Sequence, residues 1–195
     1  MITSRPIKGT TKRNLMNSTD DQLRALHLAA DAKAQAENLM IVDLVRNDLG
    51  RVCEVGSVHV PKLMHVETYA SVHQMVSTIT GKLQEGRDLV DALVATFPGG
   101  SMTGAPKLRT MELISALEGH PRGIYSGTIG YIGMNGAADL NIVIRTALIV
   151  NDTITIGAGG AIVALSNADE VLLCSIIICM DMIHALLASL LYQRN

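Results

Sequence analysis

Apolar residues in the first part of the chain recur with the period of an α-helix. Carboxylates at Asp20 and Asp21 favour a helix start, and the pattern continues to about Asn47, with a break near Asp31. Gly50 then ends the helical segment. Two shorter segments have the same period, and a proline in the first turn favours a helix start in the second of them. We therefore predict helices over residues 19–47, 88–96 and 105–117.

The later part of the chain has the pattern of short strands. Segments rich in Val, Ile and Thr favour strands over residues 51–60, 71–80, 125–133, 140–150 and 153–156. Asn135-Gly136 and Asn151-Asp152 are typical turn pairs, so we expect antiparallel hairpins around them. Because helices dominate early and strands late, the fold class that this order predicts is α+β.

Residues 171–192 form a long apolar run, VLLCSIIICMDMIHALLASLLY. The run is long enough to span a bilayer, but a membrane position would bury Asp181 near its middle, at a cost of about 2.5–3.5 kcal/mol. We therefore favour a helix that faces a core over a membrane anchor, and a sequence altered late in the gene is a third interpretation. The chain accordingly divides into a domain over residues 1–170 and an atypical apolar C-terminal helix over residues 171–195.

The composition excludes several classes of protein. The 195-residue chain carries a formal net charge of −2 and only 3% aromatic residues, which argues against nucleic-acid binding by charge or by base stacking. Its three cysteines are too few for a disulfide framework or a zinc site, so we expect a cytoplasmic protein. We also expect no secretory signal, since no apolar run follows the first basic residues.

Three side chains are candidates for chemistry. Lys8 follows Pro6-Ile7 and precedes Gly9, and its amine is a nucleophile only when neutral; taken alone, a solvated loop lysine is the plainer interpretation. Glu37 precedes an apolar helical stretch and could hold Mg²⁺, a cation that prefers oxygen ligands. His73 lies in an apolar strand pattern, where it is either a hydrogen-bonded core residue or, facing a pocket, a general acid or base.

Two glycine-rich turns can expose backbone N–H groups to an anion. The first, FPGGSMTGAPK at residues 97–107, leads into a predicted helix, and the second, GAGG at residues 157–160, follows a predicted strand. Arg145, expected on a strand beside the second turn, can bind a carboxylate with two hydrogen bonds. Together with Glu37 these features favour a dicarboxylate substrate, and plain loops and helix caps are the alternative.

A set of ordered motifs gives the chain a family resemblance. The motifs are PIKGT, AENLMIVDLVRNDLG, VHQMVSTITGKL, FPGGSMTGAPKLRTMELI, GIYSGTIGYIG, NIVIRTALI and GAGGAIV. Over residues 5–170 the sequence resembles the chorismate-utilising enzymes and, within them, the aminodeoxychorismate synthase component I (para-aminobenzoate) branch. The resemblance implies a fold of antiparallel sheets flanked by helices, of which this chain supplies a part.

Lys8 decides the branch, because the related anthranilate synthases typically carry Ala at this position. The resemblance implies that Lys8 attacks C2 of chorismate as the C4 hydroxyl leaves, and that ammonia then adds at C4 and expels the lysine. The product would be 4-amino-4-deoxychorismate, which leads to para-aminobenzoate and folate. The ammonia would be free or would come from a glutamine amidotransferase subunit.

The resemblance also implies roles for other residues. His73 resembles the active-site histidine, and Glu37 and Glu170 resemble the glutamates that bind Mg²⁺, which holds the ring carboxylate of chorismate. The implied substrate contacts are Ser101 and Thr103 to the ring carboxylate, Tyr125 and Arg145 to the pyruvyl carboxylate, the backbone N–H groups of Gly159 and Gly160, and the pocket lining at Gly9 and Thr10.

The last part of the sequence departs from the family pattern. Leu165 stands where relatives carry an aspartate and Cys174 where they carry a lysine, and the spacing between them indicates a deletion. Relatives also begin well before the PIKGT motif. Two alternatives to chorismate amination therefore stay open: anthranilate synthase component I, and a truncated fragment without catalytic activity.

Overall fold

The computed structural model describes residues 1–164 and 166–192, with side chains described up to Ile183. The chain forms two compact units, Met1–Leu108 and Arg109–Asn195. The domain boundary that we expected at residue 170 stays a prediction.

The first unit is built on a four-stranded antiparallel sheet with β4 (Val72–Gly81) at its centre. β3 (His59–Thr68) pairs along β4, while β1 (Ile2–Ser4) and β2 (Ile7–Lys12) pair with successive parts of it. The strand expected at residues 71–80 is therefore confirmed.

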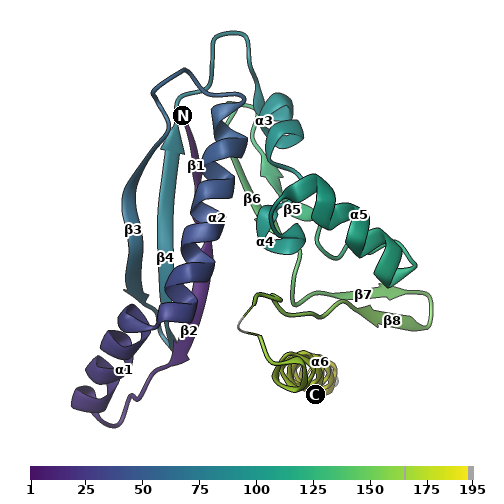
Figure 1. Cartoon of the computed structure of the whole chain (residues 1–195). Coiled ribbons are helices and arrows are strands. Elements are labelled where there is room, and N and C mark those ends of the chain that lie inside the picture. Colours follow the sequence, from purple (N-terminus) through teal and green to yellow (C-terminus); the bar gives the residue numbers. More distant parts are fainter. Residues whose placement is uncertain (165, 193–195) are drawn as a thin grey trace. The chain divides into compact units, whose positions relative to one another are not determined.

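Helices α1 (Ser18–Ala30) and α2 (Ala32–Gly50) lie over one face of this sheet (Figure 1). Asp31 separates them, because its side chain accepts a hydrogen bond from the backbone N–H of Ala34 at 2.9 Å and so caps α2. The predicted helical segment with a break near Asp31 is confirmed.

β4 carries the core of the first unit on alternate residues. Met75 and Ile79 are fully buried. Leu28 and Ala34 from the two helices pack with Met75, and Val42 belongs to the cluster around Ile79. This alternation is expected for a strand with one face covered by helices.

Three shorter helices follow the sheet. They are α3 (Leu89–Thr96), α4 (Gly100–Thr103) and α5 (Lys107–Glu118), the last of which continues into the second unit. Asp88 and Asp91 form a capping box at the start of α3. The helices predicted at residues 88–96 and 105–117 are confirmed, and α4 is an additional short helix within the glycine-rich segment.

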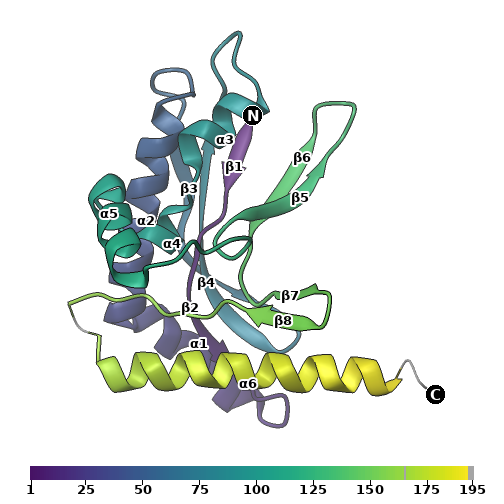
Figure 2. The same cartoon turned by 90° about the vertical axis from the view of Figure 1, so that its right-hand side faces the viewer.

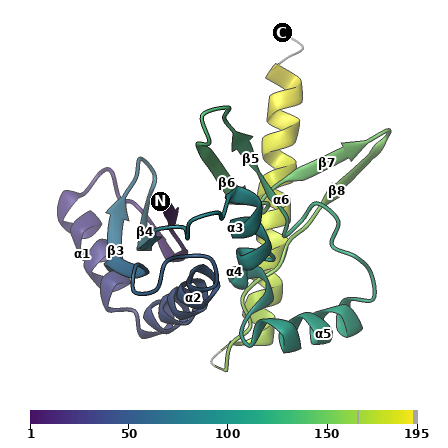
Figure 3. The same ribbon diagram turned by 90° about the horizontal axis from the view of Figure 1, so that it is seen from above.

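The second unit contains two separate two-stranded hairpins and a long helix (Figures 2 and 3). The predicted turns at Asn135-Gly136 and Asn151-Asp152 lie between paired strands, so both antiparallel hairpins are confirmed. The elements of this unit are β5 (Thr128–Ile132) with β6 (Ala138–Ile142), β7 (Ala147–Val150) with β8 (Thr153–Ile156), and α6 (Ala168–Tyr192).

The strand prediction at residues 51–60 was wrong over most of its length. Residues 51–58 form turns around an isolated bridge between Cys53 and Leu83. Gly56 has a φ of +79°, which an extended strand does not accommodate. The strand β3 begins only at His59, and its continuation was missed because its sequence does not alternate regularly.

α6 is exposed, where we expected a helix that faces a core. Leu172, Leu173 and Ile176 are all more than half exposed, and none of the α6 side chains described up to Ile183 is buried. Every residue of β5 is likewise exposed, so this strand buries no apolar face against α6. Among the described residues, no helix combines the length and the apolar character needed to cross a membrane.

Candidate functional site

Lys8 lies in a β-bulge of strand β2. The pairing of β2 with β4 shifts between Ile7 and Thr10, so Lys8 and Gly9 together take the place of one residue. Gly9 adopts a φ of +86°, a conformation that favours glycine. Lys8 is half-buried, and Thr10 is exposed. Bulges redirect side chains and are frequent beside active sites, so the local geometry suits a reactive lysine.

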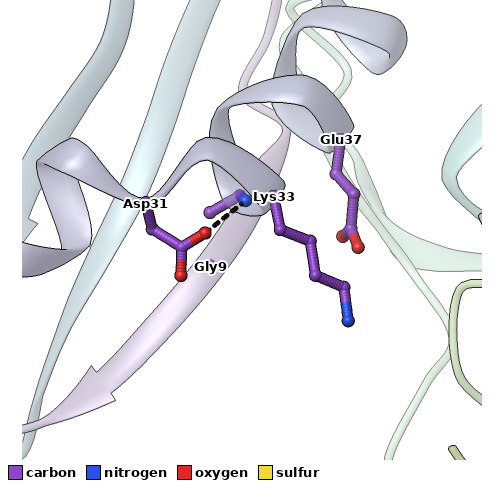
Figure 4. A pocket seen from close by; sticks show the side chains of 5 residues that line it. Gly9, Asp31, Lys33 and Glu37 are labelled. Carbon is purple, nitrogen blue, oxygen red and sulfur yellow. Dashed lines mark hydrogen bonds between the residues drawn. The ribbon is translucent and has the colours of Figure 1, made fainter. Parts of the chain in front are cut away.

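Glu37 lines an open pocket of about 200 Å³ next to this bulge (Figure 4). Lys33 and Glu37 extend from successive turns of α2 on the same side, while the Asp31 carboxylate turns back to cap the helix. The pocket is lined by Gly9, Asp31, Lys33, Ala34 and Glu37. The structure thus brings together two of the predicted site positions, Gly9 and Glu37.

The Glu37 carboxylate of this pocket is of the kind that binds Mg²⁺, and the ammonium of Lys33 belongs to the same lining. Mg²⁺ is commonly bound by one or two carboxylates, with water and substrate oxygens as its remaining ligands. Glu37 is half-buried and supplies one such carboxylate. No group of three or more His, Cys, Asp or Glu side chains that could hold a metal ion occurs among the described residues.

His73 belongs to a buried hydrogen-bonded network. Its side chain is 3% exposed, with Nδ1 at 2.9 Å from Thr68 Oγ1 and Nε2 at 3.0 Å from Asp21 Oδ1. Arg13 in turn donates to Asp21 Oδ2 at 2.8 Å, and its hydrogen bonds hold the pKa of that carboxyl well below its usual range. Of our two interpretations, this geometry favours a satisfied core histidine.

The segment that contains Ser101 and Thr103 packs against α2 through Gly100. A Cβ atom on Gly100 would lie 2.4 Å from Leu44 Cδ2, so a side chain at this position would have to displace the end of Leu44. Ser101 is half-buried, and Thr103 is buried with its Oγ1 donating to the carbonyl of Gly104 at 3.3 Å. Ser101 is therefore the more available of the two predicted hydroxyls.

In the second unit, the structure brings Tyr125 together with the glycine-rich turn. A Cβ atom on Gly157 would lie 2.3 Å from Tyr125 Cγ, and one on Gly159 would lie 3.3 Å from the Tyr125 hydroxyl. Burial raises the pKa of Tyr125, which keeps its phenol protonated as a hydrogen-bond donor. The structure thus places two of the predicted site residues, Tyr125 and Gly159, next to each other.

Three other predicted site residues of this unit are Arg145, Gly160 and Glu170. Arg145 lies in an exposed bend between β6 and β7 with a φ of +50°, so our expectation of a continuous strand over residues 140–150 was wrong. Gly160 approaches the first turn of α6, where a Cβ atom would lie 3.0 Å from Val171 Cγ1. Glu170 is exposed in that turn, and its backbone N–H donates to Asn167 Oδ1. Leu165 lies outside the described residues.

The family described as chorismate binding enzyme matches residues 1–170. The chain belongs to this family. It is 58% identical over 167 residues to the aminodeoxychorismate synthase of Streptomyces pristinaespiralis, an alignment that covers 86% of this chain and 23% of the relative. It is 51% identical over 165 residues to the anthranilate synthase component 1 of Mycobacterium bovis, covering 85% of this chain and 32% of that protein.

The crystal structure of anthranilate synthase component I from Streptococcus pneumoniae shares the fold. The TM-score is 0.81 at 39% identity, and the match covers 92% of this chain and 39% of the other. The expected α+β class and the partial chorismate-utilising fold are therefore confirmed. The chain spans about a quarter of the length of the Streptomyces relative.

The sequence analysis of this family member missed two residues that shape the surroundings of Tyr125. Gly157 allows the ring to lie against the turn, and the Arg122 guanidinium lies 5.9 Å from the ring centroid. The glycine run GAGG was visible in the sequence, but its partner ring was not. Arg122 stands three residues before Tyr125. Because the residues between them form a loop, this spacing does not predict a contact between the two side chains.

Proposed function

We propose that this chain contributes to an enzyme that aminates chorismate to 4-amino-4-deoxychorismate, in the route to para-aminobenzoate and folate. The observation that carries the proposal is Lys8, which lies in a glycine-containing bulge beside the pocket that Glu37 lines. The high identity to a protein named aminodeoxychorismate synthase supports it. Anthranilate synthase component I is the second candidate, since a relative with that name is also half identical.

Lys8 would act as a nucleophile in two displacement steps. Its neutral amine adds to C2, both ring double bonds shift toward C4, and the C4 hydroxyl leaves as water after it gains a proton. Ammonia then adds at C4, both double bonds return to their original positions, and the C2–N bond breaks to release Lys8. The overall reaction consumes chorismate and ammonia and forms 4-amino-4-deoxychorismate and water. A covalent route replaces one difficult displacement with two easier ones.

The proposal includes Mg²⁺ with Glu37 as one ligand and Glu170 as a second. When bound, the ion would neutralise the ring carboxylate of chorismate. The remaining assignments are Ser101 and Thr103 to the ring carboxylate, Tyr125 and Arg145 to the pyruvyl carboxylate, and the backbone of Gly159 and Gly160. A glutamine amidotransferase subunit would supply ammonia.

Product analysis of the purified chain tests this function. The chain is incubated with chorismate, Mg²⁺ and an ammonium salt at about pH 8.5, which increases the neutral fraction of amines, and the products are followed by mass spectrometry. Lys8→Ala is compared with Lys12→Ala, a lysine at the end of the same strand. We expect aminodeoxychorismate from the parent chain and from Lys12→Ala, but not from Lys8→Ala.

Other results would point to the alternatives. Anthranilate as the product would assign the chain to the second candidate function. Folded protein that yields neither compound would support a fragment without catalytic activity.

A further inference from the structure

A buried ion pair joins the end of α2 to the start of α5. Lys107 Nζ donates to Asp48 Oδ2 at 2.7 Å and to the Thr96 carbonyl at 3.2 Å. The Asp48 side chain is 8% exposed and that of Lys107 is 20% exposed. Burial raises the pKa of Asp48, while the ammonium of Lys107 acts in the opposite direction.

This pair closes the glycine-rich segment that carries Ser101 and Thr103. The segment leaves α3 after Thr96 and returns at Lys107, and the lysine bonds to the carbonyl at its beginning. At its middle, Gly100 packs closely on the side chain of Leu44 of α2, 2.4 Å from the position that a Cβ atom would take. Two independent contacts with α2 therefore fix where the segment lies.

Stability alone explains this pair poorly. Burying two charges costs several kcal/mol per ion, and apolar residues of similar volume often stabilise a protein equally well or better. What apolar residues would not provide is direction, because the ammonium must point at a carboxylate and a carbonyl at the same time. The pair therefore suits a role in which the position of the segment matters.

We propose that Asp48 and Lys107 are positioning residues for chorismate, which hold the Ser101–Thr103 segment against α2 so that its polar groups meet the substrate carboxylate. The inference rests on the proposed function for its substrate. The same helix carries Glu37 eleven positions before Asp48. The pair thus fixes one substrate-binding segment to the element that carries the proposed metal ligand.

The test compares three variants of the full chain. Lys107→Met leaves Asp48 buried without its ammonium, Asp48→Leu/Lys107→Met replaces both charges with apolar groups, and Lys107→Arg keeps the charge. Asp43→Asn is the matched control, because Asp43 lies on the same helix but is 82% exposed at its side chain. Each protein is measured for its thermal midpoint, its chorismate affinity by equilibrium dialysis with Mg²⁺, and amide hydrogen exchange over residues 97–106.

We expect the stability and the affinity to separate. Lys107→Met loses stability and binds chorismate about 10- to 100-fold more weakly, since small displacements at a binding segment cost this much. The apolar double variant regains its thermal midpoint but not its affinity, and its segment exchanges about tenfold faster. Lys107→Arg recovers part of the affinity, and Asp43→Asn changes none of the three measurements.

A double variant that regains both its thermal midpoint and its affinity would overturn the proposal, because the pair would then be merely structural. If the parent chain does not bind chorismate, the proposed function fails for this chain, and the exchange measurement still decides. Faster exchange over residues 97–106 in the stable double variant supports the positioning role, and unchanged exchange refutes it.

Discussion

Gly9→Ala tests whether the bulge beside Lys8 depends on the close approach of β2 to the two helices. An alanine Cβ at this position would lie 2.8 Å from Ala34 Cβ and 3.0 Å from Leu28 Cδ1. Both neighbours are buried. Ala34 Cβ cannot rotate away, because it is attached directly to the backbone of α2. The substitution therefore forces the strand and the helix apart.

Two separate costs add in this variant. A non-glycine residue at a φ of +86° costs about 1–2 kcal/mol in backbone strain. Overpacking against Ala34 and Leu28 adds about 1–3 kcal/mol. We therefore expect a loss of about 2–5 kcal/mol in the free energy of unfolding of the first unit.

Gly56→Ala isolates the first cost. Gly56 has a similar φ of +79°, but no atom lies within 4 Å of the position of its missing Cβ. Its variant should lose only the strain energy. The difference between the two variants, about 1–3 kcal/mol, measures the overpacking.

Urea unfolding followed by far-ultraviolet circular dichroism measures both variants. With an m-value of about 2 kcal/mol/M, the Gly9→Ala midpoint should lie about 0.5–1.5 M below that of Gly56→Ala. Removing the methyl group opposite, in Gly9→Ala/Ala34→Gly, should recover much of this difference relative to Ala34→Gly alone. Equal midpoints for the two glycine variants would refute the argument, since the close approach would then carry no energy.

Two further predictions concern the other clusters. The pKa of Asp21 lies well below its usual range in the folded chain. The ionised Asp21 therefore stabilises the fold fully above the unfolded pKa of about 4, and this contribution is lost as the pH falls below that unfolded pKa. Asp21→Asn should therefore flatten the loss of urea stability between about pH 5 and pH 2, whereas Asp43→Asn should retain it; parallel curves would contradict this. Gly157→Ala should displace the Tyr125 ring, and ultraviolet titration should show the raised pKa of Tyr125 fall toward about 10; an unchanged titration would show that the ring never lay against the turn.

Elements with local signals could be predicted from the sequence. Asp31 both ends α1 and caps α2, and the bond that does so spans three residues. The turn pair Asn151-Asp152 likewise specifies its hairpin through adjacent residues. β3 carries no such signal, because its register with β4 shifts twice and Met64 within it has a φ of +52°. Its strand conformation depends on pairing with β4 rather than on its own pattern.

The sequence predicted which residues could form the candidate site, but not which of them contact one another. Lys8, Glu37 and Tyr125 could be named as candidates from the sequence because each lies in a contiguous motif, and their roles stay predictions. The sequence did not decide between the two interpretations of His73, since its hydrogen-bond partner Asp21 is 52 residues away. The partner of Asp48 was equally hidden, because Lys107 follows it by 59 residues. Hydrogen bonds over such separations leave no local pattern.

In the two predicted anion turns, glycine occurs for a different physical reason from the one we inferred. We predicted that FPGGSMTGAPK and GAGG are turns that expose backbone N–H groups. In the structure, Gly100 makes room for Leu44 and Gly157 makes room for the Tyr125 ring. At both positions a Cβ atom would approach its neighbour to 2.4 Å or less, so close packing favours glycine there, more strongly at Gly157, where the neighbour is the base of a tyrosine ring. A glycine-rich turn therefore predicts an anion site only where the glycine has open space around it, and in this chain Gly159, with a single neighbour at 3.3 Å, comes nearer to that condition than Gly100 or Gly157.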